Sequence, residues 1–380
     1  MSRLPIPLTV FLLAALFGCN SYNYNQNPSP APPAPLAGFQ PMWCAHWMDR
    51  EPLLFEKTSP NSPPTANLWF TPTTVPCLAS SDGSSHYLQE SDFLWTPGSR
   101  TLTLPATSRI PFLTAGQLHP APGSPNSLPS GDGQNTLLFA KGSFFHQHQV
   151  DASYSHAEIW SPPTPDPPSP NLPLTLQKLQ AGSPLKIVIL GDSIAAGGDA
   201  TGLLKVPPCQ PPFPILVANE LQSHYRLAPN SVTLTNLSQG GKKSGWGVTR
   251  IPDLIAQQPD LVILAFGIND AADVSPDDFL CNIQIILTET HDACPNCEFI
   301  LVASMFPNPD DKLLDPSLLL AYRDQLLSFK RPGVEVADVS TLWQRLLQRK
   351  KFADLTGNGI NHPNDFAHRL YAQTILQLLE

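Results

Sequence analysis

Five short apolar runs that alternate with helical stretches constrain the fold of this chain more than any other feature. The runs lie at 186–190, 232–237, 261–266, 299–303 and 334–339. Helical stretches lie at 213–225, 248–257, 277–290 and 316–329, and a final one at 367–379 closes the chain. Strands that alternate with helices predict a parallel sheet with both faces covered. Such sheets bind their ligands beyond the carboxyl ends of the strands.

The segment before this pattern has a different character. Residues 41–160 carry short strand-like pieces separated by turn signals, which predicts a β-sandwich. The pieces are 53–55, 66–70, 93–95, 101–104 and 136–139. If a further piece, 144–150, is a strand, as we expect at the end of this region, it places His146 and His148 on one face. The two are interpreted as ordinary strand histidines, with a metal pair as the alternative, because no third ligand is evident.

Proline marks the boundaries between these segments. The chain has 44 prolines among 380 residues, well above the usual share of roughly 5%. They concentrate at 27–38 and 161–173, and such runs act as semi-rigid spacers. The predicted organisation is a signal peptide at 1–19, a tether at 20–40, a β-sandwich at 41–160, a linker at 161–177 and an α/β domain at 178–380.

The N-terminus predicts export. Arg3 precedes an apolar stretch from Leu8 to Phe17, which is too short to span a membrane and suits a secretory signal. Residues 16–19 resemble a bacterial lipobox, which implies a lipidated Cys19 and a membrane-anchored lipoprotein, periplasmic or on the cell surface. The alternative is an ordinary signal peptide and a secreted protein. An exported chain can pair its remaining six cysteines; Cys294 and Cys297 are interpreted as a local disulfide or as two free thiols.

Charge narrows the classes of partner. The net charge is −9, and no basic stripe is present, which argues against a nucleic-acid-binding protein.

Polar and glycine-rich blocks follow the predicted strands. Gly191-Asp192-Ser193 ends the first strand, 236–241 follow the second, 267–270 follow the third, and 361–365 follow the fifth. A serine at the start of a helix suits a nucleophile whose substrate becomes an oxyanion. A histidine to take the serine's proton is available at 362, and amide donors for the oxyanion are available at 269 and in the glycines.

The order of these blocks resembles the SGNH (GDSL-type) hydrolase superfamily over residues 185–380. The resemblance implies a flavodoxin-like five-stranded parallel sheet, with Ser193 as nucleophile and His362 as base. It implies oxyanion donors from the Ser193 N–H, the Gly241 N–H and the Asn269 amide, with Gly240 as the alternative glycine. It implies no cofactor and no metal.

One position departs from the family pattern. The family places an aspartate three residues before its histidine, and that position here is Gly359. We therefore expect a Ser–His dyad, with Asn358 or a main-chain oxygen orienting His362. Asp365 is expected to cap the last helix, and Asp192 is expected to hold the turn at the serine.

These features predict a serine esterase that removes acyl groups, most specifically acetyl groups, from a carbohydrate. The expected partner is a small acyl ester or an acylated glycan, with membrane contact only through the N-terminal anchor. The glycan preference rests on the resemblance of a β-sandwich followed by an SGNH domain to bacterial carbohydrate O-acetylesterases. The alternatives are a lipase or lysophospholipase of the same superfamily and a non-catalytic glycan-binding surface lipoprotein.

Overall fold

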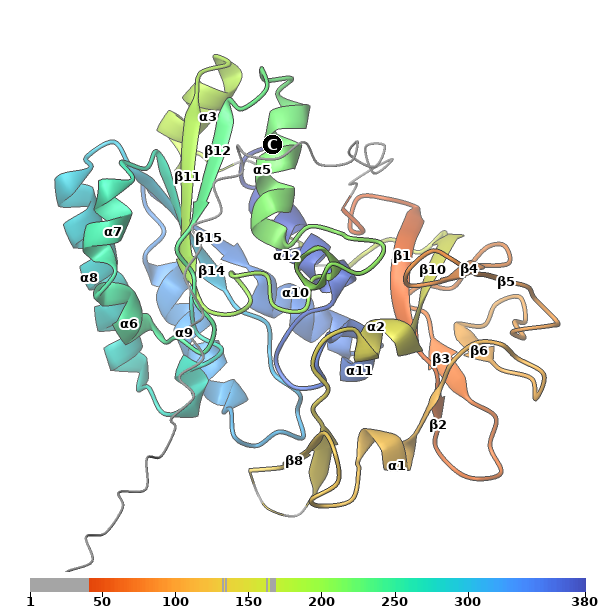
Figure 1. Ribbon diagram of the computed structural model, residues 1–380. Helices are drawn as coiled ribbons and strands as arrows, with labels where there is room; N and C mark the ends of the chain where they lie inside the picture. The colour runs from red at the N-terminus through yellow and green to blue at the C-terminus, as the bar shows by residue number, and fades with distance from the viewer. Residues whose placement is uncertain (1–40, 132, 134, 162, 165–168) are drawn as a thin grey trace, which may run out of the picture.

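The computed structural model describes residues 41–380, apart from 132, 134, 162 and 165–168. The predicted signal peptide, tether and Cys19 lie outside the described residues. The chain folds into a sheet-rich N-terminal region and a C-terminal α/β domain (Figure 1). One cluster of buried apolar side chains includes residues of both regions. No described helix combines the length and the apolar composition that crossing a bilayer requires.

A five-stranded parallel sheet forms the centre of the α/β domain. Its strands are β11 (Leu185–Gly191), β12 (Val232–Asn236), β13 (Leu261–Ala265), β14 (Glu298–Ala303) and β15 (Val334–Asp338). They lie in the order β12-β11-β13-β14-β15, which is the flavodoxin-like order expected from the resemblance. Every residue of the central strand β13 is buried, as a strand covered on both faces requires. The α/β fold prediction is confirmed.

Helices cover both faces of this sheet. In Figure 1, α6 (Ser244–Val248), α7 (Ile251–Ala256), α8 (Pro276–Ala293) and α9 (Pro316–Ser328) lie on one side, and α5 (Phe213–His224) and α12 (Asp365–Leu376) pack together on the other. The remaining helices of the domain are α3 (Pro173–Gln180), α4 (Thr201–Leu204), the 3-10 turn η1 (Asp270–Ala272), α10 (Val339–Leu347) and α11 (Phe352–Leu355). Helix α3 begins inside the predicted linker.

The longest helix shows how local sequence sets these elements. Ser275 caps α8 by accepting a hydrogen bond from the Asp278 N–H, and Pro276 occupies the first turn, where its missing N–H has no cost. Phe279, Ile283 and Leu287 then recur at helical spacing and are buried.

The N-terminal region contains two four-stranded sheets and a hairpin. The first sheet has the order β1-β10-β4-β5, the second has the order β6-β3-β2-β7, and β8 pairs with β9. Their bounds are β1 Trp47–Leu54, β2 Glu56–Lys57, β3 Thr65–Asn67, β4 Cys77–Ser80, β5 His86–Tyr87, β6 Thr101–Thr103, β7 Leu113–Thr114, β8 Ser127–Pro129, β9 Thr136–Leu138 and β10 Gln149–Ser155. Two short helices, α1 (Ala115–Leu118) and α2 (Phe144–His148), complete the region.

The strand prediction for 144–150 is wrong over most of its length. Residues 144–148 form helix α2, and β10 begins only at Gln149. The two histidines therefore do not share a strand face. The His146 ring contacts the Asp199 carbonyl oxygen, while His148 Nδ1 lies 2.8 Å from the Phe144 carbonyl oxygen of its own helix.

Buried polar contacts join the two regions. Lys350 Nζ lies 2.8 Å from Glu51 Oε1, and both side chains are 1% exposed. The Leu54 N–H donates to Asp354 Oδ1 at 2.7 Å, next to this pair. Arg369 of α12 donates to the carbonyl oxygens of residues 49 and 50. The first sheet is thereby fixed to the segment that leads into α12.

Candidate active site

The serine of the first block lies in the turn that follows β11. The Asp192 N–H donates to the Ala265 carbonyl, which ties the turn to the end of β13. The buried Asp192 carboxyl accepts the Ile194 N–H at 2.9 Å, so this side chain holds the turn, as predicted. Burial raises the pKa of Asp192 to about 7.

The histidine of the last block reaches this serine. His362 Nε2 lies 2.8 Å from Ser193 Oγ, although the two residues come from opposite ends of the domain sequence. The histidine loop closes on itself, because the Gly357 N–H and the Thr356 hydroxyl both donate to the His362 carbonyl. A serine and an imidazole at this distance form the arrangement of a nucleophile and its general base.

An aspartate that the sequence analysis did not select completes a chain of hydrogen bonds. Asp199 Oδ2 lies 2.7 Å from His362 Nδ1, and the Asp199 side chain is 10% exposed. The three side chains therefore have the connectivity of a serine–histidine–aspartate triad. The carboxylate comes from the loop that carries the serine, instead of from the position three residues before the histidine.

The expectation of a dyad with Asn358 behind it is wrong. Asn358 Oδ1 accepts the backbone N–H groups of residues 360, 361 and 362, and its amide donates to Asn361 Oδ1. With its oxygen committed to three donors, Asn358 shapes the histidine loop and does not reach the imidazole. A main-chain oxygen is not needed at Nδ1, because the Asp199 carboxylate occupies that place.

Two glycines allow the close packing of these loops. A Cβ atom on Gly198 would stand 2.9 Å from both His362 Nδ1 and Cε1, so only glycine lets the chain pass the imidazole. Gly359 has a φ of +89°, and a Cβ there would clash with the Leu138 carbonyl of the N-terminal region. The residue that replaces the family aspartate is thus required by the contact between the two regions.

The predicted oxyanion donors lie in loops that are joined to the serine turn. A Cβ on Gly240 would lie 3.7 Å from Ser193 Cβ, and Gly241 follows with a φ of +72°. Asn269 Nδ2 donates one hydrogen to the Lys242 carbonyl at 3.1 Å, which couples the asparagine to this glycine segment and leaves its second amide hydrogen available. The oxyanion donors stay predictions. They are the Ser193 N–H, the Gly241 N–H with Gly240 as the alternative, and the Asn269 amide.

Asp365 does not cap the last helix. The side chain of Asn364 accepts the Ala367 N–H and is the cap of α12. Asp365 is 6% exposed and binds Thr201 instead, with its carboxylate accepting both the N–H at 2.9 Å and the hydroxyl at 2.5 Å. This contact holds the chain two residues beyond Asp199.

Other residues near the site have structural contacts. His368 is fully buried, its Nε2 lies 3.0 Å from the Gly198 carbonyl, and burial lowers its pKa to about 4.

Two cations lie near the Trp246 ring: Lys242 Nζ is 5.7 Å and the Arg250 guanidinium 5.6 Å from its centroid. These cations near its ring favour a packing role for Trp246 over stacking on a sugar. Cys294 and Cys297 are free thiols.

Comparison with known proteins identifies the domain that carries the triad. The three side chains have the connectivity that hydrolases with a nucleophilic serine use. Residues 189–370 match the model of the GDSL-like Lipase/Acylhydrolase family. The α/β domain belongs to this family, which confirms the resemblance drawn from the sequence, and the protein is a carboxylic ester hydrolase.

Solved structures with a similar fold cover about half of the chain. An α/β hydrolase from the metagenome of Lake Arreo is 23% identical, over 52% of this chain and 97% of its own, with a TM-score of 0.43. A tryptophan-to-isoleucine mutant of an acetyl-xylooligosaccharide esterase from Geobacillus stearothermophilus is 22% identical, over 53% and 96%, with a TM-score of 0.44. A two-domain esterase active on acetylated mannans is 21% identical, over 57% and 54%, with a TM-score of 0.44. A search of curated protein sequences gave no match.

Asp199 has only a weak signal in the sequence. Its only signal is a carboxylate that follows two glycines, Gly197 and Gly198, in the loop after the nucleophile strand. With Gly359 in the usual acidic position, a search of every strand-end loop for another carboxylate would have included it.

Proposed function

We propose that this protein is a serine esterase that removes acetyl groups from a carbohydrate by way of an acyl-enzyme. The observation that carries the proposal is the continuous chain of contacts from Ser193 Oγ through the His362 imidazole to Asp199 Oδ2, at 2.8 and 2.7 Å. A hydroxyl is a weak nucleophile until a base takes its proton, and this chain supplies the base and the group that orients it.

The reaction proceeds in two halves. Ser193 Oγ attacks the ester carbonyl while His362 Nε2 takes the hydroxyl proton, and Asp199 stabilises the imidazolium that forms. The oxyanion accepts hydrogen bonds from the Ser193 N–H, a glycine N–H at 240 or 241, and the Asn269 amide. The bond between the carbonyl carbon and the sugar oxygen then breaks, His362 gives its proton to the departing oxygen, and the acetyl group stays on Ser193. In the second half His362 activates a water that releases acetate and regenerates the serine.

The acetyl and carbohydrate preferences rest on the order of the two regions in the sequence, an N-terminal sheet-rich region followed by the acylhydrolase domain. The proposed location rests instead on the apolar stretch from Leu8 to Phe17 and the lipobox-like residues 16–19. We propose export and a lipid anchor on Cys19, and replacing Cys19 with serine should release the protein from membranes. Continued membrane association of that variant would contradict the anchor.

Hydrolysis of p-nitrophenyl acetate, butyrate and octanoate tests the proposal, together with acetate release from a peracetylated disaccharide. We expect acetate hydrolysis that falls steeply with chain length and a loss of at least about 1,000-fold in kcat for Ser193→Ala. Ser223→Ala, on the exposed face of α5, is the matched control and should retain full activity.

Other outcomes point to the alternatives. Preference for octanoate would indicate a lipase. A serine-reactive phosphonate should label the wild type and not Ser193→Ala; if the wild type neither hydrolyses these esters nor takes the label, the esterase proposal is contradicted and a glycan-binding protein is favoured.

A further inference from the structure

A histidine of the N-terminal region contacts the acid of the triad. His146 lies on α2 and is 5% exposed. Its Nε2 is 3.2 Å from the carbonyl oxygen of Asp199, which lies 53 residues further along the chain. A carbonyl oxygen only accepts hydrogen bonds, so Nε2 carries the hydrogen and donates it. Through this bond, a residue outside the acylhydrolase domain restrains the main chain at Asp199, whose carboxylate belongs to the triad.

Asp199 needs such support because its backbone is strained. Its φ is +60°, in the left-handed region that costs a residue other than glycine on the order of 1–3 kcal/mol. Conformations of this kind persist only where the surroundings fix them. The Thr201 N–H and hydroxyl, bound by Asp365, fix the chain after Asp199, and the Gly198 N–H donates to the Ser193 carbonyl before it. The His146 bond restrains the carbonyl of Asp199 itself.

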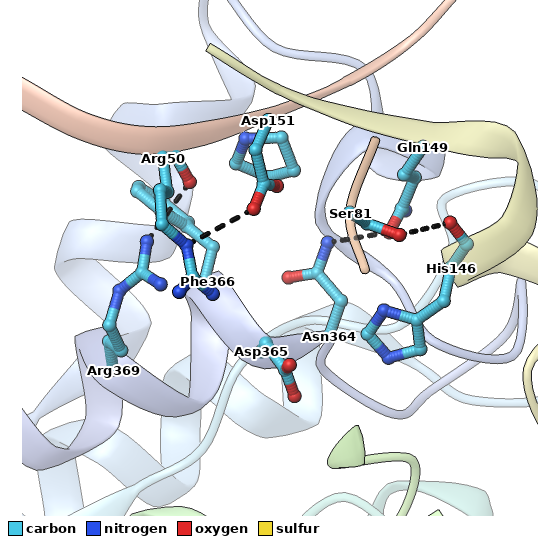
Figure 2. Close-up of a pocket in the computed structure, with 10 residues that line it drawn as sticks. Arg50, Ser81, His146, Gln149, Asp151, Asn364, Asp365, Phe366 and Arg369 are labelled. Atoms are coloured by element: carbon cyan, nitrogen blue, oxygen red, sulfur yellow. Dashed lines mark hydrogen bonds and ion pairs between the residues drawn. The ribbon is translucent and has the colours of Figure 1, made fainter. Parts of the chain in front are cut away.

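The position of His146 is itself fixed from several sides. The Ser81 hydroxyl donates to the His146 carbonyl, as Figure 2 shows. Gln149, the residue after α2, donates to the carbonyls of Ala353 and Thr356 at 2.8 and 2.9 Å, and its oxygen accepts the Asn364 amide. These bonds connect α2 to the segment that leads into the histidine loop. The helix that carries His146 therefore has a fixed relation to both His362 and Asp199.

The surroundings of His146 separate it from the reacting atoms. His146 lines a polar pocket with Arg50, Asp151, Asp365 and Arg369, and no residue of the triad lines it (Figure 2). The His146 ring bonds the main-chain carbonyl of Asp199, whereas the His362 imidazole bonds the Asp199 carboxylate and Ser193. The bond to Asp199 is therefore the direct route by which the His146 ring can affect catalysis.

We propose that His146 is a positioning residue, which holds Asp199 in the conformation that orients His362. This inference rests on the proposed serine esterase activity. It assigns the N-terminal region a part in assembling the catalytic site. Loss of the Nε2–H donor should leave substrate binding unchanged and lower the rate of the chemical step, because Asp199 would then hold His362 less accurately.

The test compares His146→Leu, which removes the donor, with His146→Gln, whose amide can donate from a similar position. For His146→Leu we expect kcat to fall about 10-fold or more with KM within about 2-fold of wild type, and we expect His146→Gln to recover most of the loss. His148→Leu, on the same helix but bonded only to its own helix carbonyl, is the control and should behave as wild type.

A double-mutant cycle shows whether the effect passes through Asp199. In an Asp199→Asn background, which retains residual catalysis, His146→Leu should cause no further loss of kcat. An equal loss in both backgrounds would overturn the proposal, as would wild-type kcat in the His146→Leu single variant. If His146→Leu does not fold by thermal melting, His146→Asn, whose shorter side chain cannot reach the carbonyl, takes its place.

Phosphonate labelling separates this inference from the proposed function. A wild type that labels at Ser193 and hydrolyses acetate, together with an unaffected His146→Leu variant, would contradict only the role of His146. A wild type without labelling or activity would contradict the esterase itself.

Discussion

The two regions of this protein contribute to the site in different ways. The α/β domain supplies every group proposed to react, and each lies in a loop at the carboxyl edge of one parallel sheet. The N-terminal region supplies no reacting group, yet it contacts the loops from behind through His146, Leu138 and Gln149. A regular sheet can bring reactive side chains together at its edge. The accuracy of their positions then depends on an irregular region that packs against the loops.

The buried ion pair between the regions gives the largest expected effect. Lys350→Met should leave the Glu51 carboxylate buried and uncompensated, and should lower the free energy of unfolding by about 3–5 kcal/mol. Urea denaturation measures the change. Lys178→Met is the matched control, because its ion pair with Asp260 is partly exposed, with side chains 40% and 24% exposed, and should contribute only about 0–1 kcal/mol. Equal effects of the two variants would show that the contact between the regions contributes no special stability.

A substitution within the α/β domain tests how sensitive catalysis is to a small displacement of the His362 ring. Gly198→Ala should lower kcat about 100-fold, because the new methyl group pushes against the His362 ring. Gly245→Ala adds the same group in α6, where the closest atom is an ordinary 3.6 Å away, and should leave kcat unchanged. Steady-state hydrolysis of p-nitrophenyl acetate measures both. Normal turnover in Gly198→Ala would mean that the two loops are not as tightly packed as described.

The pH dependence of stability gives the smallest effect. The pKa of His368 is lowered to about 4 in the folded protein from its usual 6.5, so the unfolded chain takes up the proton first as the pH falls. Between pH 7 and pH 5 this should cost the wild type about 1–2 kcal/mol of unfolding free energy, and His368→Gln should lack that part of the loss.

The wild-type pH dependence contains the contributions of other groups. The effect of His368 is therefore the difference between the unfolding free energies of wild type and His368→Gln at each pH. The raised pKa values of Asp192 and Asp151, about 7 and about 6, make their contributions rise as the pH falls, which opposes the effect of His368. Identical pH dependence of the urea midpoint in wild type and His368→Gln would show that His368 does not titrate as described.

The sequence predicted the sheet well because four of its five strands are almost entirely buried and read as apolar runs. The run 261–266 reads as a continuous apolar segment and becomes β13, which ends at Ala265. The segment 144–150 was misassigned because seven residues hold too little periodic information to distinguish a short helix from a strand. Only its last residues, from Gln149, join a strand, β10.

The site was predicted as far as the family pattern extends. Ser193 follows the end of β11, His362 lies in the loop between α11 and α12, and the two come together in space. Asp199 was missed because its role depends on a left-handed backbone that the sequence does not encode in a recognisable way and that contacts distant along the chain support. Asn358 was selected because it lies near the histidine in sequence, but its oxygen is used by the loop it shapes.

The most direct test of the account is the kcat of Asp199→Asn compared with that of Asn358→Ala, each measured on p-nitrophenyl acetate with the thermal melting temperature as a check of folding. If Asp199 orients His362, Asp199→Asn should lower kcat by roughly 1,000-fold to 10,000-fold and remain folded. Asn358→Ala should act mainly through the stability of the histidine loop, with a much smaller fall in the kcat of the folded protein. Near-normal turnover in Asp199→Asn, with a large loss in folded Asn358→Ala, would contradict the triad.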